Sequence, residues 1–295
     1  MIIIDGKEVS EEIKIELTEK VKNKKNEIGK VPGLVTILVG DNPASLSYVT
    51  MKGKACDQIG MYSILEKHDS SMKEDELLNL VEKYNNDESI HGILVQLPLP
   101  KHINEDKIIE AINPSKDVDG FHPINVGNLV IGKEAFFPCT PYGILELIKR
   151  YNIETKGKHC VVVGRSNIVG KPIANMMLQK KEGANCIVTV CHSAAKDLSI
   201  FTKTADILIA AIGSPNFIKG DMVKEGVAVI DVGINRVDDI SAKKGYKIVG
   251  DVEYDSVANK SSYFTPVPGG VGPMTIAMLM KNTYTAFCRI NKIRE

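Results

Sequence analysis

The chain has 295 residues, of which 43% are hydrophobic and 25% charged, enough for two domains of ordinary size in a globular protein. Its formal net charge is zero, so it lacks the basic field that would favour nucleic acid or an anionic membrane as a partner. Six cysteines with no C-x-x-C pair argue against a zinc site and a disulfide framework, and favour a reducing cytoplasm. The start, MIIIDGKEVSEEIK, has too short an apolar run for a signal peptide or a membrane-spanning helix.

Strand and helix patterns alternate along the first half of the chain. Residues 10–29 predict a helix, because Ser10 suits the N-cap, apolar residues recur on one face and Gly29 ends the pattern. The continuous apolar run GLVTILVG, residues 33–40, is typical of a strand in a parallel sheet covered on both faces. The other predicted elements are a helix within 41–60, a strand at 62–69, a helix opened by a capping box at Ser71 and Glu74, a strand at 91–100, a helix at 104–112, and a helix from Thr140 to about Tyr151.

A second alternation occupies the rest of the chain. Strands are predicted at 159–163, 186–191, 206–212, 227–232 and 247–249, with helices between the first of them and a final helix over about 275–290. Repeated β-α-β order predicts an α/β protein with doubly wound parallel sheets in two domains, divided near residue 140. Within 201–256 the type of each short apolar run stays open, because periodicity alone cannot distinguish a strand from a buried helix.

The stretch VVVGRSNIVGKP, residues 161–172, places two glycines and a lysine after an apolar strand. An NTPase phosphate loop needs G-x-x-x-x-G-K-[ST], but here five residues separate Gly164 from Gly170, and Pro172 replaces the hydroxyl that holds Mg²⁺. The turn instead favours a dinucleotide, because free N–H groups at the start of a helix from about Ile168 attract a phosphate. An ordinary strand–turn–helix stays the alternative at this point.

The end of the next strand bears on coenzyme choice. A dinucleotide fold that prefers NAD often carries an acid there for the ribose 2′-hydroxyl, but this strand ends in Cys191-His192-Ser193. No carboxylate repels a 2′-phosphate, Arg165 is available to pair with one, and His192 or Ser193 can donate to it. These residues favour NADP, with an ordinary surface role for Arg165 as the alternative. Because no further Cys or His stands at ligand spacing, no metal site is expected.

Four polar residues in the first half are candidates for chemistry. Tyr48 and Lys52 lie four residues apart and share a helix face, although such a pair is usually a solvated surface feature. Gln96 stands near the end of a strand, where open α/β sheets line their ligand crevices. Asp119 lies in KDVDG, a stretch that also suits a plain turn. Gly53, inside the predicted helix, either weakens it or lets the backbone approach a neighbour.

Seven motifs follow one another along the chain, and together they favour a functional role for these residues over a purely structural one. The motifs are GDNPASLSYVTMK, QLPLP, KDVDGFHPIN, PCTPYGILEL, VVVGRSNIVGKP, DVGIN and TPVPGGVGPMT. Over about residues 2–285 the chain closely resembles the bifunctional methylenetetrahydrofolate dehydrogenase/methenyltetrahydrofolate cyclohydrolase family of the FolD type. The resemblance implies a catalytic folate-binding domain over 1–139, completed by a C-terminal helix at 275–295. It also implies a Rossmann-type NADP-binding domain over 140–274, a cleft between the two, and a homodimer.

The resemblance also implies roles for individual residues. Lys52 matches the catalytic lysine, Gln96 the glutamine that holds it, Tyr48 the tyrosine beside the substrate, and Asp119 the aspartate that recognises the pterin. The residues implied in substrate binding are Tyr48, Lys52, Val95, Gln96, Leu97, Asp119, Pro266, Gly269 and Gly270, the last three within a loop over 266–274. Those implied in NADP binding are Gly164, Arg165, Ser166, Ser193 and Ile234.

The implied activity is oxidation of 5,10-methylenetetrahydrofolate with NADP⁺, then hydrolysis of the methenyl product to 10-formyltetrahydrofolate. Lysine suits the second step because partial burial brings its pKa toward neutrality. A cyclohydrolase with one activity only, and another NADP-dependent dehydrogenase, are the alternatives. A non-catalytic nucleotide-binding protein would leave Lys52, Gln96 and Asp119 without a role.

Overall fold

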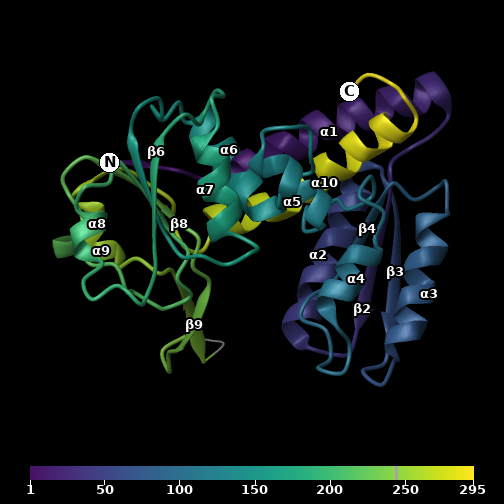
Figure 1. The fold of residues 1–295 in the computed structure, drawn as a ribbon, viewed down its shortest axis with the longest axis horizontal. Helices are drawn as coiled ribbons and strands as arrows, with labels where there is room; N and C mark the ends of the chain where they lie inside the picture. The colour runs from purple at the N-terminus through teal and green to yellow at the C-terminus, as the bar shows by residue number, and fades with distance from the viewer. Residues whose placement is uncertain (243–244) are drawn as a thin grey trace. The chain divides into compact units, whose positions relative to one another are not determined.

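The computed structural model describes residues 1–242 and 245–295, which divide into two compact units (Figure 1). We call Glu11–Cys139 with Ile276–Glu295 the small-sheet unit, and Met1–Ser10 with Thr140–Thr275 the large-sheet unit. The prediction of an α/β protein in two units with parallel sheets is confirmed. The expected first domain began at residue 1, but Met1–Ser10 groups with the large-sheet unit, because strand β1 (Ile2–Ile3) pairs with β11 (Ser261–Phe264).

The small-sheet unit is built on three parallel strands in the order β3-β2-β4. These are β2 (Gly33–Val39), β3 (Tyr62–His68) and β4 (Gly92–Val95). Every residue of β2 is buried, as the continuous apolar run predicts. The helices of this unit are α2 (Pro43–Ile59), α3 (Glu74–Asn85), α4 (Glu105–Ala111) and α5 (Pro123–Val130), with most of α1 (Gly6–Ile28) and α10 (Val271–Ile290).

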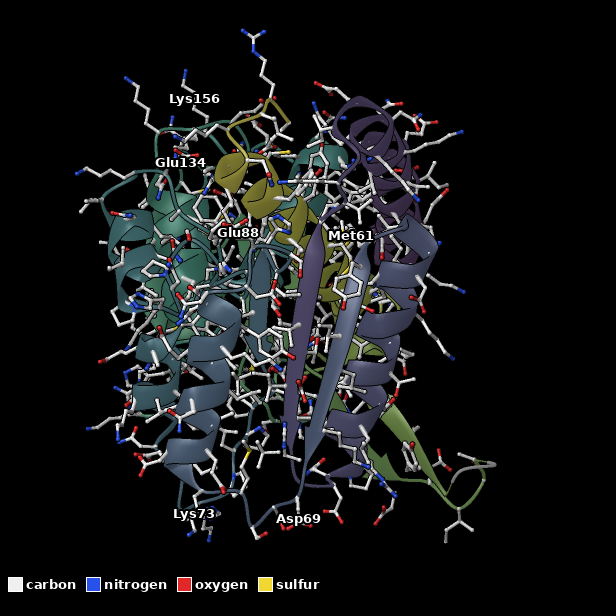
Figure 2. All side chains as sticks on the ribbon, turned by 90° about the vertical axis from the view of Figure 1, so that its right-hand side faces the viewer. Met61, Asp69, Lys73, Glu88, Glu134 and Lys156 are labelled. Atoms are coloured by element: carbon white, nitrogen blue, oxygen red, sulfur yellow. The ribbon has the colours of Figure 1, made fainter. Side chains whose placement is uncertain are left out.

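Helices cover both faces of β2. On one face, apolar side chains of α3 and α4 join those of β2 and β4 in a single core cluster. α2 also packs against β2 and β3, and it contacts α10 where the Cys56 thiol lies 3.5 Å from the Met280 sulfur. Figure 2 shows β2 and β3 side by side, with Met61 and Asp69 marking the ends of β3. β3 is an edge strand, and it leaves Tyr62 and Leu65 48% and 51% exposed.

The large-sheet unit holds six parallel strands in the order β1-β11-β8-β7-β5-β6. Its remaining strands are β5 (His159–Val163), β6 (Ile187–Cys191), β7 (Ile207–Ala210) and β8 (Val227–Asp231). Its helices are α6 (Cys139–Arg150), α7 (Gly170–Leu178), α8 (Ser199–Thr202), α9 (Tyr254–Ala258) and the 3₁₀ turn η1 (Gly220–Met222). From β5 the chain moves outward to β6 and then back to β7, so the strand order reverses between β5 and β7. Ligands of open α/β sheets bind at the carboxyl ends of strands beside such a reversal.

One predicted strand has a different partner from the expected one. Residues 247–249 lie in β10 (Tyr246–Val249), which pairs antiparallel with β9 (Asn235–Asp238) in a separate two-stranded sheet. β9 alternates between partly buried and exposed residues, and β10 has an exposed residue among partly buried ones, so neither strand is fully buried. Such a pattern is typical of a hairpin, whereas the strands of a covered parallel sheet are continuously apolar.

Several predicted helix starts differ from the observed ones: α1, predicted from Ser10, begins at Gly6, and local hydrogen bonds account for the starts of α3 and α7. α3 begins at Glu74, where the Glu76 carboxylate accepts from the Lys73 amide at 2.8 Å, so the predicted capping box at Ser71 is wrong. α6 begins at Cys139, one residue before the predicted cap at Thr140. α7 begins at Gly170, because the Ser166 hydroxyl accepts from the amides of Val169 and Gly170 at 3.1 and 3.3 Å.

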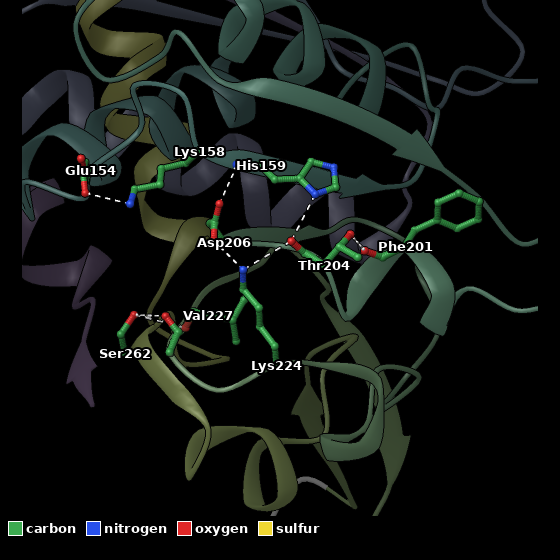
Figure 3. A network of polar contacts seen from close by, with 10 residues as sticks. Glu154, Lys158, His159, Phe201, Thr204, Asp206, Lys224, Val227 and Ser262 are labelled. Atoms are coloured by element: carbon green, nitrogen blue, oxygen red, sulfur yellow. Dashed lines mark hydrogen bonds and ion pairs between the residues drawn. The ribbon is translucent and has the colours of Figure 1, made fainter.

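A polar network fastens the amino ends of the large sheet (Figure 3). The Asp206 carboxylate, just before β7, accepts from the His159 amide of β5 at 2.8 Å and pairs with Lys224 at 2.5 Å. The His159 ring is hydrogen-bonded to the Thr204 carbonyl at 3.1 Å. The hydrogen bond from Lys224, followed by that from the His159 amide, lowers the pKa of Asp206. These contacts hold the amino ends of the strands in place. The ligand is expected at the opposite edge of the sheet, at the carboxyl ends.

Candidate functional site

Lys52 and Gln96 form the centre of the candidate site in the small-sheet unit. Lys52 lies in the middle of α2 with its side chain buried, and its Nζ donates to Gln96 Oε1 at 2.9 Å. Gln96 follows β4 directly, and its Nε2 donates to the Leu97 carbonyl at 2.8 Å. Because that carbonyl can only accept, it holds the amide nitrogen and turns Oε1 toward the lysine. The lysine therefore has a fixed and uncharged partner.

Lys52 shares its buried surroundings with Asp119 and Cys139, and burial shifts the pKa of all three side chains. Burial lowers the pKa of Lys52, and the negative charge of Asp119 opposes that shift. Burial likewise raises the pKa of Asp119, which Lys52 opposes. The Cys139 thiol donates to the Val118 carbonyl at 3.5 Å, and burial followed by the nearby Asp119 charge raises the pKa of this thiol well above its ordinary value. The group therefore joins a neutral thiol to an amine and a carboxylate whose charged forms burial disfavours.

The other predicted substrate residues fall in two groups. Tyr48, Val95 and Leu97 belong to the small-sheet unit, like Lys52 and Asp119. Tyr48 lies one turn before Lys52 on α2 and is partly buried, and Val95 and Leu97 flank Gln96 at the end of β4.

Pro266, Gly269 and Gly270 belong to the large-sheet unit, in the loop between β11 and α10. Gly269 has a φ of +111°, and a Cβ on Gly270 would lie 2.6 Å from the Pro266 carbonyl oxygen. The turn therefore requires glycine at both positions. Its backbone is also fastened to the start of α1, where the Lys7 amide donates to the Gly269 carbonyl at 3.0 Å.

The predicted coenzyme turn lies at the reversal of strand order. Gly164 follows β5 with a φ of +137°, and a Cβ there would lie 2.2 Å from the Ala211 carbonyl oxygen after β7. A Cβ on Gly170 would lie 2.3 Å from the Gly164 carbonyl oxygen. Glycine at both positions therefore brings the start of α7 against the turn and leaves the carboxyl ends of β5 and β7 open to a phosphate.

The remaining predicted coenzyme residues surround this turn. Arg165 and Ser166 follow Gly164, Ser193 follows β6 and Ile234 follows β8, so all lie beyond the carboxyl ends of strands of one sheet, and all are exposed. The strand β6 ends without a carboxylate, while Arg165 offers a cation and Ser193 a hydroxyl. This set of donors fits the 2′-phosphate of NADP.

Two buried aspartates shape the same edge of the large sheet, and sequence analysis missed both. The Asp251 carboxylate accepts from the amides of Ile212, Gly213 and Ser214 at 2.6, 2.9 and 3.0 Å, so it orders the loop after β7. Asp231, the last residue of β8, accepts from the amides of Gly233, Asp251 and Val252 at 2.9 Å each. Burial raises the pKa of Asp231 to about 6. The available signal was an aspartate close to a glycine near a strand end: Asp251 directly follows Gly250, and Asp231 lies two residues before Gly233.

Residues 1–242 and 245–295 contain no group of three or more His, Cys, Asp or Glu side chains able to hold a metal ion. Over the same residues, no helix is both long and apolar enough to cross a membrane.

Comparisons with known proteins agree on one family. The catalytic-domain model of the tetrahydrofolate dehydrogenase/cyclohydrolase family matches residues 4–119, and its NAD(P)-binding-domain model matches residues 138–291. The bifunctional protein FolD of Chlorobium chlorochromatii is 61% identical over 293 residues, 99% of each chain. The structure of the bifunctional FolD enzyme of Campylobacter jejuni is 52% identical with a TM-score of 0.92, covering 97% of this chain and 98% of that one. The Trypanosoma brucei FolD enzyme, solved with NADP and an inhibitor, is 39% identical with a TM-score of 0.92, covering 98% and 97%. The chain therefore belongs to the tetrahydrofolate dehydrogenase/cyclohydrolase family.

Proposed function

We propose that this protein oxidises 5,10-methylenetetrahydrofolate to 5,10-methenyltetrahydrofolate with NADP⁺ and then hydrolyses that product to 10-formyltetrahydrofolate. The observation that carries the proposal is the buried Lys52 amine held 2.9 Å from the uncharged Gln96 amide. Both domains of the bifunctional family are matched, and the relative in Chlorobium chlorochromatii is named a bifunctional protein. Another dehydrogenase would use the coenzyme turn but would leave Lys52 and Gln96 without a task.

Lys52 serves as the proton-transfer group of the second step. Water attacks the methenyl carbon, which bridges two nitrogens of the folate, and the adduct opens when a proton moves from oxygen to one of those nitrogens. Because burial lowers the pKa of Lys52, this amine gives up its proton more readily than an exposed lysine, so it can accept a proton and return it. Gln96 orients this amine without adding a negative charge, which would raise the pKa of Lys52 again.

The remaining predicted residues bind and orient the two reactants. Asp119 offers two carboxylate oxygens to paired N–H donors of the pterin edge, and Tyr48, Val95 and Leu97 lie on the same unit. When bound, NADP⁺ accepts a hydride from the methylene carbon, a step that mainly requires both rings to be positioned. Gly164 and Ser166 hold the coenzyme phosphates beside α7, Arg165 and Ser193 its 2′-phosphate, and Ile234 its apolar surface. In the loop after β11, Pro266, Gly269 and Gly270 close over the folate.

A spectrophotometric assay with methylenetetrahydrofolate and NADP⁺, repeated with NAD⁺, tests this proposal. We expect the wild type to form NADPH and to convert the methenyl intermediate onward. Lys52→Met should abolish the second conversion while the protein stays folded, because methionine keeps the bulk but cannot carry a proton. Lys54→Met, at an exposed position two residues along the same helix, is the matched control and should keep both activities.

Either of two results would refute the assignment. A Lys52→Met enzyme with the full cyclohydrolase rate would remove the lysine from the reaction. A wild type that hydrolyses methenyltetrahydrofolate but forms no NADPH would be a cyclohydrolase only.

The structure also supports proposals about the oligomeric state of the protein and its location in the cell. We propose a homodimer, supported by the free edge of β3 and its exposed Tyr62 and Leu65. We also propose a cytoplasmic location, because all six cysteines are free and buried, as in proteins of a reducing compartment.

A further inference from the structure

Asp119 lies in a segment without helix or strand, so its position depends on the residues on either side of it. The segment begins beside β4, where the Ile93 amide donates to the Lys116 carbonyl at 2.9 Å. After Asp119, the chain turns at Gly120 with a φ of +75°. A carboxylate that must accept two donors of a flat ring edge needs a fixed orientation. The orientation of Asp119 therefore depends on the contacts that hold the backbone at this point.

Asp117 holds the part of the loop that follows Asp119. Its buried carboxylate accepts from the amides of Gly120, Phe121 and His122 at 3.2, 3.2 and 2.9 Å, and from Asn125 Nδ2 at 2.8 Å. All four donors come from residues 120–125, so one side chain fixes the whole turn. Through the Gly120 amide these contacts hold the peptide that follows Asp119, but none of them reaches the peptide between Val118 and Asp119.

Asn282 of the C-terminal helix α10 supplies the missing contact. It is buried, and its Nδ2 donates to the Val118 carbonyl at 2.8 Å and to the Phe137 carbonyl at 3.0 Å. The Val118 carbonyl belongs to the peptide that leads into Asp119. The two N–H bonds of this amide are thus directed at two carbonyls, one on each segment beside the candidate site.

The two segments that Asn282 joins also approach each other closely. A Cβ on Gly120 would lie 2.6 Å from the Phe137 carbonyl carbon, so the chain before Cys139 packs directly on the Asp119 turn. Cys139 lies beside the same group, with its sulfur 3.5 Å from the Val118 carbonyl oxygen and 3.8 Å from Asn282 Nδ2. A small displacement of the Val118 peptide would therefore move both Asp119 and its thiol neighbour.

We propose that Asn282 is a positioning residue for folate binding, which sets the orientation of Asp119 by clamping the Val118 and Phe137 carbonyls from helix α10. The inference rests on the proposed function, in which Asp119 binds the pterin. It assigns a specific task to the C-terminal helix: the helix holds the folate-recognition loop in place although its clamp does not touch the substrate.

The test compares steady-state kinetics of Asn282→Leu with those of a matched control. Leucine has a similar size but donates nothing, so KM for methylenetetrahydrofolate should rise about tenfold, the effect of losing roughly one net hydrogen bond. KM for NADP⁺ should stay within about twofold, because loss of one donor in the small-sheet unit removes no coenzyme contact. Thr283→Val is the control, since the buried Thr283 hydroxyl donates only to the Leu279 carbonyl of its own helix, at 2.8 Å.

Two further variants separate positioning from general destabilisation. Asn282→Gln keeps the amide donors and should restore part of the folate affinity, whereas a merely structural role predicts that the longer side chain is worse than leucine. The double variant with Asp119→Ala should bind folate no more weakly than Asp119→Ala alone, because Asn282 acts through that aspartate. If Asn282→Leu does not fold, Asn282→Ser takes its place, since the short hydroxyl cannot reach both carbonyls.

The outcomes separate failure of the inference from failure of the proposed function. If Asp119→Ala leaves KM for folate unchanged, the proposed role of Asp119 is wrong and the inference falls with it. If Asp119→Ala raises that KM and Asn282→Leu does not, only the inference is overturned. Equal losses in Thr283→Val, or losses that multiply in the double variant, would also overturn it.

Discussion

Lys52 is buried, and its surroundings favour the neutral form of the amine, which has a lone pair for proton transfer. Burial lowers its pKa, and a carboxylate as its direct partner would cancel that shift, whereas Gln96 holds it through a neutral oxygen. Asp119 provides the nearby negative charge but is itself disfavoured by burial in its charged form. The lysine can therefore stay ordered in both of its protonation states.

Gly53 directly follows this lysine and offers a stability test. A Cβ built at this position meets no atom within 4 Å, and its φ lies outside the left-handed region. Gly53→Ala should therefore raise the free energy of unfolding by about 1 kcal/mol, because alanine loses less backbone entropy in a helix. Thermal melting checks this, with Gly127→Ala in α5, where a Cβ also meets nothing, as the parallel case. An unchanged or lower melting temperature would mean that the glycine serves a close approach.

The individual site residues were predictable to different degrees. Tyr48, Lys52, Gln96 and Asp119 stand in specific motifs, and their proposed roles stay predictions that kinetics must test. Cys139 was visible in PCTPYG but carries no pattern of its own, since a lone buried cysteine usually only packs. Asn282 and Asp117 act on backbone carbonyls and amides, which any sequence provides, so only the coordinates show which ones they reach.

Strands that consist of a continuous run of apolar residues were predicted well. β2 and β5 are continuous buried runs, and their predicted and observed bounds agree within a residue. β1 was missed because it is two residues long and both are exposed. α5 was missed because it has only eight residues and comes shortly after KDVDG, a stretch that suits a turn, although His122 caps the helix and Pro123 follows. The β9–β10 hairpin was misassigned because four-residue strands carry little periodicity.

The edge strand β3 provides a test of the proposed homodimer. Leu65→Lys places a charge on its exposed apolar surface and should convert a dimer to a monomer, because an unpaired lysine is costly to bury in an interface. Sedimentation or light scattering measures the mass. Ile187→Lys on β6, an edge strand of the large sheet where Ile187 is 64% exposed, is the control and should stay dimeric. A monomeric wild type, or dissociation by Ile187→Lys instead, would contradict the assignment.

For the molecule as a whole, the two units should respond oppositely to mild acid. His91, in the small-sheet unit, accepts from the Gly33 amide at 3.0 Å, and burial, followed by Lys116, lowers its pKa to about 4. Its contribution to stability is therefore complete above pH 6.5 and is lost as the pH falls toward 4. Asp231, in the large-sheet unit, has a pKa raised from 3.8 to about 6, so its contribution is complete below 3.8 and is lost as the pH rises through 6. Each shift corresponds to roughly 3 kcal/mol.

Hydrogen exchange, corrected for the intrinsic effect of pH, measures this contrast. Between pH 6.5 and 4.5, the amides of β2 should lose protection while those of β8 gain it. His91→Gln should remove most of the loss in β2 and leave β8 unchanged. A parallel fall in both sheets would show that these two groups do not govern the response to acid.

The pairing of Ile2 with Tyr263 has a consequence for how the protein is made. β1 is synthesised about 260 residues before its partner β11, so it cannot pair until β11 has been made. The small-sheet unit needs still later residues, because Asn282 and most of α10 follow β11 along the chain. A nascent chain cut at residue 260 would therefore leave both units unfinished. We expect chaperones to bind this protein during the interval between synthesis of β1 and synthesis of α10.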